Sequence, residues 1–208
     1  MPEPVASNPV GLCGFYGKLP ARGDFVRAGL PRSFTDPWDD WLQAAIAASR
    51  AALGEDWLPS WMEAPIWRFA LPGGSCGDLA VLGLWMPSID RAGRHFPLTL
   101  ALLAPGASAH DLAGRGTLWL DAAEQAGLDA LEHVIAPEEL TARLDAAPLP
   151  DGLAPGSQSN SALWWTAGSP FVPPSSLRLR GLPDPAQFAT MIRDPDGNPA
   201  HNGCVEAS

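Results

Sequence analysis

Two segments of the 208-residue chain bring together the residue types that could carry chemistry. Residues 11–31 contain five glycines and the chain's single lysine, and residues 88–97 form a charged turn that runs into an apolar stretch. Glycines allow positive backbone φ or a close approach, and charged residues on loops often carry function. The candidate site residues in these segments are Lys18, Arg22, Asp24, Arg27, Asp90, Arg91 and Arg94.

These charged residues have two interpretations, and the sequence favours neither. We call residues 17–27 the first charged loop and residues 88–95 the second charged loop. If both loops lie at one end of a sheet, they form a polar pocket or a docking face for an anionic group. Alternatively, their opposite charges pair and only fix the two loops against the end of the sheet.

Spacing argues against nucleotide hydrolysis by the first charged loop. A phosphate-binding loop has a glycine five residues before the Gly-Lys pair, and a Ser or Thr directly after the lysine. Leu12 and Leu19 occupy these two positions. The residues that phosphoryl transfer requires are therefore missing.

The remaining catalytic candidates are His95, as a general base oriented by Asp24 or Asp90, and Ser88 as a nucleophile. No Gly-x-Ser-x-Gly motif surrounds Ser88, and a single histidine beside a strand is more often structural. The other histidines have no partner at a useful spacing, and no His or Cys residues have the spacing of metal ligands. We therefore expect no catalytic residues, no metal and no cofactor.

Composition limits the classes of protein that fit. The formal net charge is −10, from 23 acidic and 13 basic residues, which argues against a nucleic-acid partner. No apolar window is long enough for a transmembrane helix, and the N-terminus lacks a secretory signal, so we expect no membrane insertion. Three cysteines at unhelpful spacings fit a reducing cytoplasm and predict no disulfide framework, and Cys13 with Cys76 is the one geometrically possible pair.

Hydrophobic periodicity predicts the elements that position the two loops. Residues 35–53 carry apolar side chains at helical spacing, with Thr35 or Ser33 as the cap and Gly54 at the end. The connections between the central strands are too short for helical crossovers, which predicts an antiparallel meander. Strands are predicted at residues 11–17, 66–71, 79–86, 96–103, 161–166 and 176–180.

Further helices are predicted at residues 55–62, 118–135, 137–144 and 182–194. Trp57 and Trp61 fit a core role better than a role as interface anchors. The pattern predicts an α/β fold, a single-domain three-layer sandwich with a mixed, largely antiparallel central sheet of five or six strands flanked by helices. We expect a flexible N-terminal arm over residues 1–10, one domain over 11–193 and a disordered C-terminal tail over 194–208.

Six segments carry a resemblance to a known family. They are GFYGKLPARGDFVRAGLP, the Trp-bearing helix that ends in LG, APIWRFALPGG, GLWMPSIDRAGRHFPLTL, SALWWT and GLPDPAQFATMI. In this order they resemble the TagF (ImpM) family of type VI secretion-associated proteins, from about Gly14 to Ile192. The order of six separate segments makes the resemblance specific.

The resemblance implies a non-enzymatic cytosolic accessory protein that represses a bacterial type VI secretion system after translation. It also implies that the protein binds Fha, the forkhead-associated-domain scaffold of the system, and that it has a three-layer α/β fold. No catalytic residues follow from it, and the two charged loops would shape or support the docking face. The alternative is a small anionic-ligand-binding protein or hydrolase that uses residues 17–27 and 88–95 as a pocket.

Overall fold

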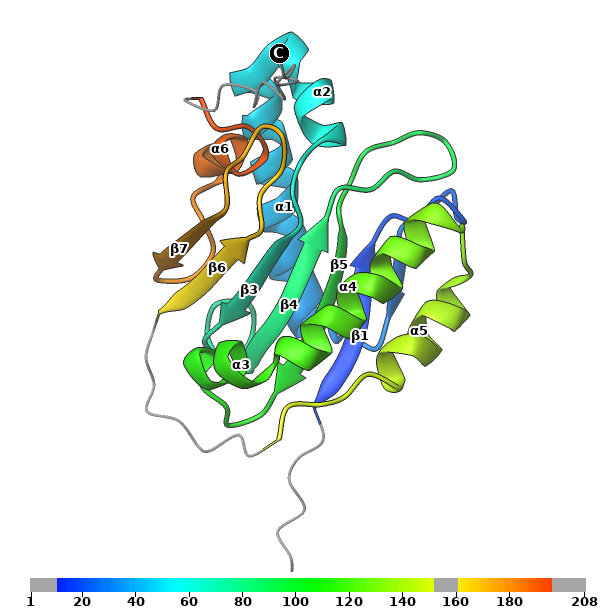
Figure 1. The fold of residues 1–208 in the computed structure, drawn as a ribbon, viewed down its shortest axis with the longest axis vertical. Coiled ribbons are helices and arrows are strands. Elements are labelled where there is room, and N and C mark those ends of the chain that lie inside the picture. The colour runs from blue at the N-terminus through cyan, green and yellow to red at the C-terminus, as the bar shows by residue number, and fades with distance from the viewer. Residues whose placement is uncertain (1–10, 152–160, 196–208) are drawn as a thin grey trace, which may run out of the picture.

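A seven-stranded antiparallel sheet forms the centre of the computed structural model, which describes residues 11–151 and 161–195 (Figure 1). The strand order is β2-β1-β5-β4-β3-β6-β7. The prediction of a mixed sheet with five or six strands was therefore wrong, because the described strands number seven and all their pairings are antiparallel. The strands are β1 (Leu12–Gly17), β2 (Val26–Ala28), β3 (Trp67–Leu71), β4 (Ala80–Met86), β5 (Leu98–Ala104), β6 (Ala162–Thr166) and β7 (Ser175–Leu179).

Helices cover both faces of the sheet, as the sandwich prediction required (Figure 1). One layer contains α1, α2 and α6, and the other contains α3, α4 and α5. The helices are α1 (Arg32–Leu53), α2 (Trp57–Met62), α3 (Ala109–Arg115), α4 (Thr117–Glu132), α5 (Pro137–Asp145) and α6 (Phe188–Ile192), with short 3-10 turns at Gly54–Asp56 and Pro185–Gln187.

The central strands β3, β4 and β5 form the predicted meander. Along β4, Val81 and Trp85 pack against the layer of α1, whereas Leu82 and Leu84 pack against the layer of α4. Successive side chains of a strand point to opposite faces, so a strand covered on both sides is apolar at every position. This explains the apolar runs of β4 and β5, in which every residue is buried and the one polar side chain, Thr99, accepts a hydrogen bond from Trp38.

Tryptophans fill the layer of α1 and join it to the C-terminal segment. Trp38 of α1 donates its indole N–H to Thr99 Oγ1 on β5 at 2.9 Å. Trp67 of β3 donates to the carbonyl of Met191 in α6 at 2.8 Å. A buried indole contributes a large apolar area when its N–H finds an acceptor in this way. The C-terminal helix is therefore held to the sheet by both packing and hydrogen bonding.

The start of α1 differs from the prediction. The helix begins at Arg32, directly after Pro31, so Ser33 and Thr35 lie inside it and do not cap it. Proline at this boundary has an extended backbone and no N–H to satisfy. The end was predicted correctly, since Gly54 terminates the helix with a φ of 53°.

Two elements, β2 and α3, were not predicted, and the last helix is shorter than residues 182–194. The prediction that Trp57 and Trp61 belong to the core is confirmed, because both are buried. Cys13 and Cys76 are free thiols, so a disulfide between them is ruled out.

Several sequence predictions lie outside the described residues. These are the arm over residues 1–10, the loop at 152–160 and the tail from residue 196 onward, which includes Cys204. Within residues 11–151 and 161–195, none of the helices has both the length and the apolar character needed to cross a membrane.

Candidate functional site

The two charged loops meet at one end of the sheet and are joined by a buried ion pair. Lys18 Nζ lies 2.5 Å from Asp90 Oδ2, and the two residues are only 4% and 2% exposed. The backbone adds two links, since the amide of Arg91 donates to the Arg22 carbonyl at 2.9 Å and Ser88 Oγ donates to the Lys18 carbonyl at 2.8 Å. The loops therefore behave as one unit.

Asp90 organises the second charged loop. Its Oδ1 accepts the backbone N–H groups of Ala92 and Arg94, each at 2.9 Å, which is the geometry of a turn closed by an aspartate. Its Oδ2 accepts from Lys18 and from Arg94 Nε, the latter at 2.7 Å. Burial by itself would raise the pKa of Asp90, but the hydrogen bonds from Lys18 and Arg94 outweigh it and hold the pKa well below its usual range.

Aromatic rings complete the support of the first charged loop. Lys18 Nζ lies 4.7 Å from the centre of the Phe25 ring, a cation–π contact. The Phe25 ring meets Phe96 edge-on at 4.7 Å and stacks on Tyr16 at 5.8 Å. Tyr16 in turn donates its hydroxyl to Asp39 of α1 at 2.6 Å. Ring contacts and hydrogen bonds on several sides therefore hold the loop in place.

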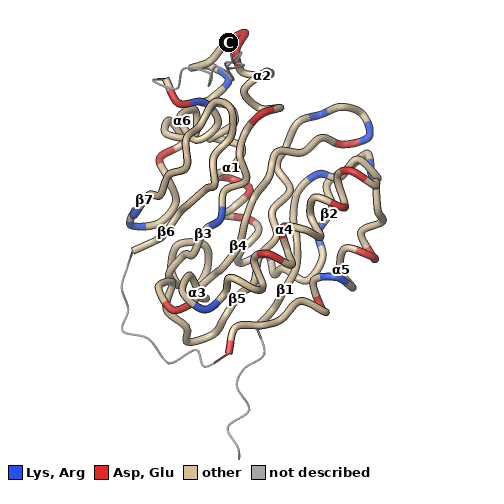
Figure 2. The backbone as a smooth tube through the Cα atoms, viewed as in Figure 1, with Lys and Arg blue, Asp and Glu red and all other residues tan. Residues whose placement is uncertain are grey.

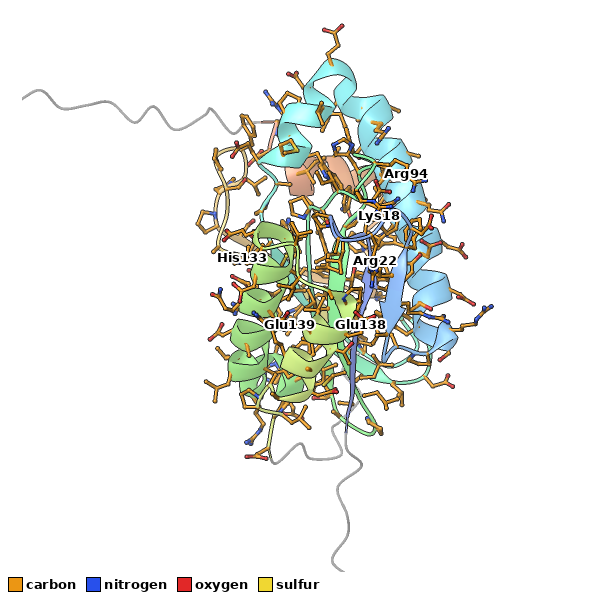
Figure 3. The ribbon with its side chains drawn as sticks, turned by 90° about the vertical axis from the view of Figure 1, so that its right-hand side faces the viewer. Lys18, Arg22, Arg94, His133, Glu138 and Glu139 are labelled. Carbon is orange, nitrogen blue, oxygen red and sulfur yellow. The ribbon has the colours of Figure 1, made fainter. Side chains whose placement is uncertain are left out.

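The outer charges of the two loops face solvent. Figure 2 shows charged positions of both loops at the same end of the molecule, and Figure 3 shows Lys18, Arg22 and Arg94 along one side of it. Arg94 donates to the Gly23 carbonyl and lies 3.8 Å from the exposed Asp24. Arg22 Nη2 lies 3.6 Å from Glu138 Oε1 of α5, with both side chains largely exposed.

Arg91 and Arg27 differ from these residues. The Arg91 side chain is exposed and forms no ion pair within the part of the chain that the structure describes. Together with residues 21–26 it lines an open cavity of about 380 Å³, which we call the arginine hollow. Arg27 lies on β2, and its side chain donates to Thr35 Oγ1 of α1 at 3.3 Å, so among the described residues this side chain is hydrogen-bonded to α1 and not to the rest of the two loops.

The catalytic candidates are not assembled. No hydrogen bond joins the side chains of Ser88, Asp90 and His95, all of which the structure describes. The His95 ring instead meets the rings of Trp57 and Trp61 edge-on, at 5.6 and 6.3 Å. Burial lowers the pKa of His95, and the nearby positive charge of Arg50 lowers it further. Within residues 11–151 and 161–195, no three His, Cys, Asp or Glu side chains cluster closely enough to hold a metal.

The sequence analysis missed a second cavity beside the first. It measures about 170 Å³, and we call it the apolar hollow. The sequence contains no signal for it, because the 59% exposure of Met62 beside the buried Trp61 is visible only in the structure. The hollow is lined chiefly by Pro20, Trp61, Met62, Pro87, Ile89 and Leu131.

Fold and site together define an α/β sandwich protein with a rigid pair of charged loops at one end of its sheet. Residues 14–147 match the family described as TagF N-terminal domain, type VI secretion system-associated. The match spans more than half of the chain, and the protein belongs to the TagF family.

A solved structure supports this assignment. The chain is similar to the crystal structure of PA0076 from Pseudomonas aeruginosa PAO1, with 35% sequence identity and a TM-score of 0.79. The similarity covers 87% of this chain and 94% of that chain. A search of curated proteins finds no match.

Proposed function

We propose that this protein is a non-enzymatic cytosolic regulator that represses a bacterial type VI secretion system by binding its Fha scaffold. The observation that carries the proposal is the TagF family match over residues 14–147, because the resemblance to this family implies that role. A role without catalysis is supported by the absence of side-chain hydrogen bonds among Ser88, Asp90 and His95, all three of which the structure describes.

The two charged loops are the proposed docking face. Lys18 and Asp90 hold the loops in one arrangement, so binding would lose little conformational entropy there. Arg22 and Arg91 are presented to solvent on this rigid support, and arginine is enriched among the residues that dominate protein interfaces. In this proposal Lys18, Asp90 and Arg94 support the face, and Arg22 and Arg91 make the contacts.

The test is co-purification of the protein with Fha. We expect Arg22→Glu combined with Arg91→Glu to abolish binding while the fold stays intact, because neither side chain supports the loops. Arg178→Glu is the matched control, since Arg178 is an exposed arginine on β7 at the other edge of the sheet. Unchanged binding by the double variant would remove the loops as the docking face. Failure of the wild-type protein to bind Fha would remove the partner.

One observation favours a second function, the binding of a small anion. The arginine hollow is open and places Arg22 and Arg91 on its walls. Thermal unfolding with nucleotides and phosphorylated metabolites tests this, because a ligand at about 100 times its Kd adds about 2.7 kcal/mol of stability. A shift that disappears in Arg91→Glu would support the small ligand, and no shift across the panel would count against it.

A further inference from the structure

The apolar hollow and the arginine hollow are built from the same two loops. Pro20 lines the first and its neighbour Ala21 lines the second. On the second charged loop, Ile89 lines the apolar hollow and Arg91 lines the arginine hollow. Residues two apart have Cα atoms separated by at most about 7 Å. The two hollows are therefore lined by neighbouring positions of the same two loops.

Exposed apolar side chains gather at this end of the molecule. Seven large apolar residues are exposed in the described part of the chain, and four of them belong here. Phe25 lines the arginine hollow, and Met62 lines the apolar hollow. Leu58 lies one turn before Met62 on the same face of α2, and Val134 follows Leu131 by three residues. Exposed apolar surface grouped in this way marks an interaction site.

Val134 adds an independent sign. It has a φ of 54° and is the only non-glycine residue with positive φ in residues 11–151 and 161–195. Glycine is the usual residue directly after a helix C-cap, and a β-branched side chain is strained there. Val134 is nevertheless 52% exposed, so its side chain gains little from burial within this chain. Residues held in strained backbone conformations cluster at functional sites.

We propose that the apolar hollow and the arginine hollow form one docking surface for a segment of a partner protein that presents a large apolar side chain beside an acidic one. The apolar side chain occupies the hollow beside Met62, and the carboxylate binds Arg91. This inference deepens the proposed function and rests on it only for the identity of the partner, which would be Fha.

The positions of the two hollows also restrict the spacing within the partner segment. The Cα atoms of Ile89 and Arg91, which line one hollow each, are separated by at most about 7 Å. That separation matches side chains three or four residues apart on a helix, or two apart on a strand. The apolar and acidic residues should therefore be two to four positions apart.

The charges around the surface favour an acidic segment over a basic one. Arg91 has no ion-pair partner among the described residues, so an incoming carboxylate displaces no existing contact. Arg22 is held by Glu138 only at 3.6 Å, with both groups exposed, and such a pair is easily exchanged. Asp24 also lines the arginine hollow, and its Oδ1 atom lies 3.8 Å from Arg94 Nη2.

Selection from a random-peptide library displayed on phage, against the immobilised full chain, tests the proposal without assuming the partner. Enriched peptides should carry a large apolar residue and an Asp or Glu two to four positions away. Met62→Glu and Arg91→Glu should each weaken the selected peptides by at least about tenfold. Leu118→Glu and Arg178→Glu are the matched controls, an exposed leucine on α4 and an exposed arginine on β7, and should leave binding unchanged.

The outcomes separate this inference from the proposed function. Enriched peptides that bind as expected but do not compete with Fha would leave the surface standing and remove Fha as its partner. Fha binding that survives both Met62→Glu and Arg91→Glu would likewise remove Fha as the occupant of this surface, and it would leave the regulatory proposal in place. A selection that shows no enrichment of peptides with an apolar and an acidic residue would overturn the docking surface. Self-association of the chain that is lost in Met62→Glu would also overturn it, because the surface would then bind a second copy of the chain.

Discussion

Replacing Lys18 with methionine tests whether the buried ion pair holds the two charged loops together. Methionine keeps most of the apolar stem of the side chain and removes the ammonium that lies 2.5 Å from Asp90. The carboxylate of Asp90 is then left buried without its main partner. Removing one partner of a buried pair typically costs about 3 to 5 kcal/mol.

The structure places the expected loss at the lower end of that range. Arg94 Nε and two backbone N–H groups still donate to the Asp90 carboxylate. We therefore expect Lys18→Met to lower the free energy of unfolding by about 3 kcal/mol. For a chain of this length, such a loss lowers Tm by about 6 to 12 °C.

Urea unfolding at neutral pH, followed by tryptophan fluorescence, measures the change. Arg22→Met is the control, because its ion pair with Glu138 is exposed and should contribute less than about 1 kcal/mol. Combining Lys18→Met with Asp90→Asn should recover part of the loss, because the double variant leaves no buried charge unpaired. A loss below about 1 kcal/mol for Lys18→Met would refute the view that this pair locks the loops.

Four further predictions follow from particular contacts. The pKa of Asp90 in the folded protein lies below its unfolded value of 3.8. The stability advantage of the wild type over Asp90→Asn should therefore be complete above about pH 5 and shrink as the pH falls below 3.8. Urea midpoints of the two proteins that stay equally far apart down to low pH would contradict this. Val134→Gly should raise stability by about 1 kcal/mol in the same assay, because glycine relieves the positive φ, and a loss would show that the side chain packs within this chain. Gly29→Ala should cost more than about 2 kcal/mol, since its φ is 71° and an added Cβ would lie 2.0 Å from a backbone oxygen; an alanine variant as stable as the wild type would exclude that backbone geometry. In a chain with its other cysteines replaced by serine, Cys76 should react with a thiol reagent only after unfolding, because burial raises the pKa of the Cys76 thiol to about 12. Rapid labelling of the folded protein would show that Cys76 is accessible.

The strands at the centre of the sheet were predictable because their sequences leave few alternatives. A run such as residues 98–104, apolar at every position except Thr99 and bounded by turns, fits a strand covered on both faces. Connections too short for a helix then require antiparallel neighbours. The tryptophans at residues 57 and 61 were assigned correctly to the core for the same reason, since a helical stripe of large apolar side chains has to be buried.

Other elements depend on contacts that local patterns do not contain. β2 has three residues and lies within a charged loop, and it is a strand only because it pairs with β1. α3 is a short helix whose start depends on Ser108 accepting from the backbone of Asp111. Short elements carry too few residues for a periodic signal, so tertiary pairing and capping decide them.

The sequence by itself determined which residues could form a site at this end of the protein, and the family to which the chain belongs. It also indicated that the two charged loops would meet if they lay at the same end of the sheet. It left open which charges pair, because Lys18 and Asp90 are 72 positions apart and only the sheet brings them together.

Only the tertiary structure decided that Lys18 and Asp90 pair in the interior, that Arg94 joins them from the surface, and that Arg91 forms no ion pair among the described residues. The tertiary structure also creates the apolar hollow, because the walls of this hollow come from four segments that are distant in the sequence. The physical reason is the same in both cases. Burial and pairing depend on which surfaces the sheet and its helices bring together, and no local pattern of residue types records that arrangement.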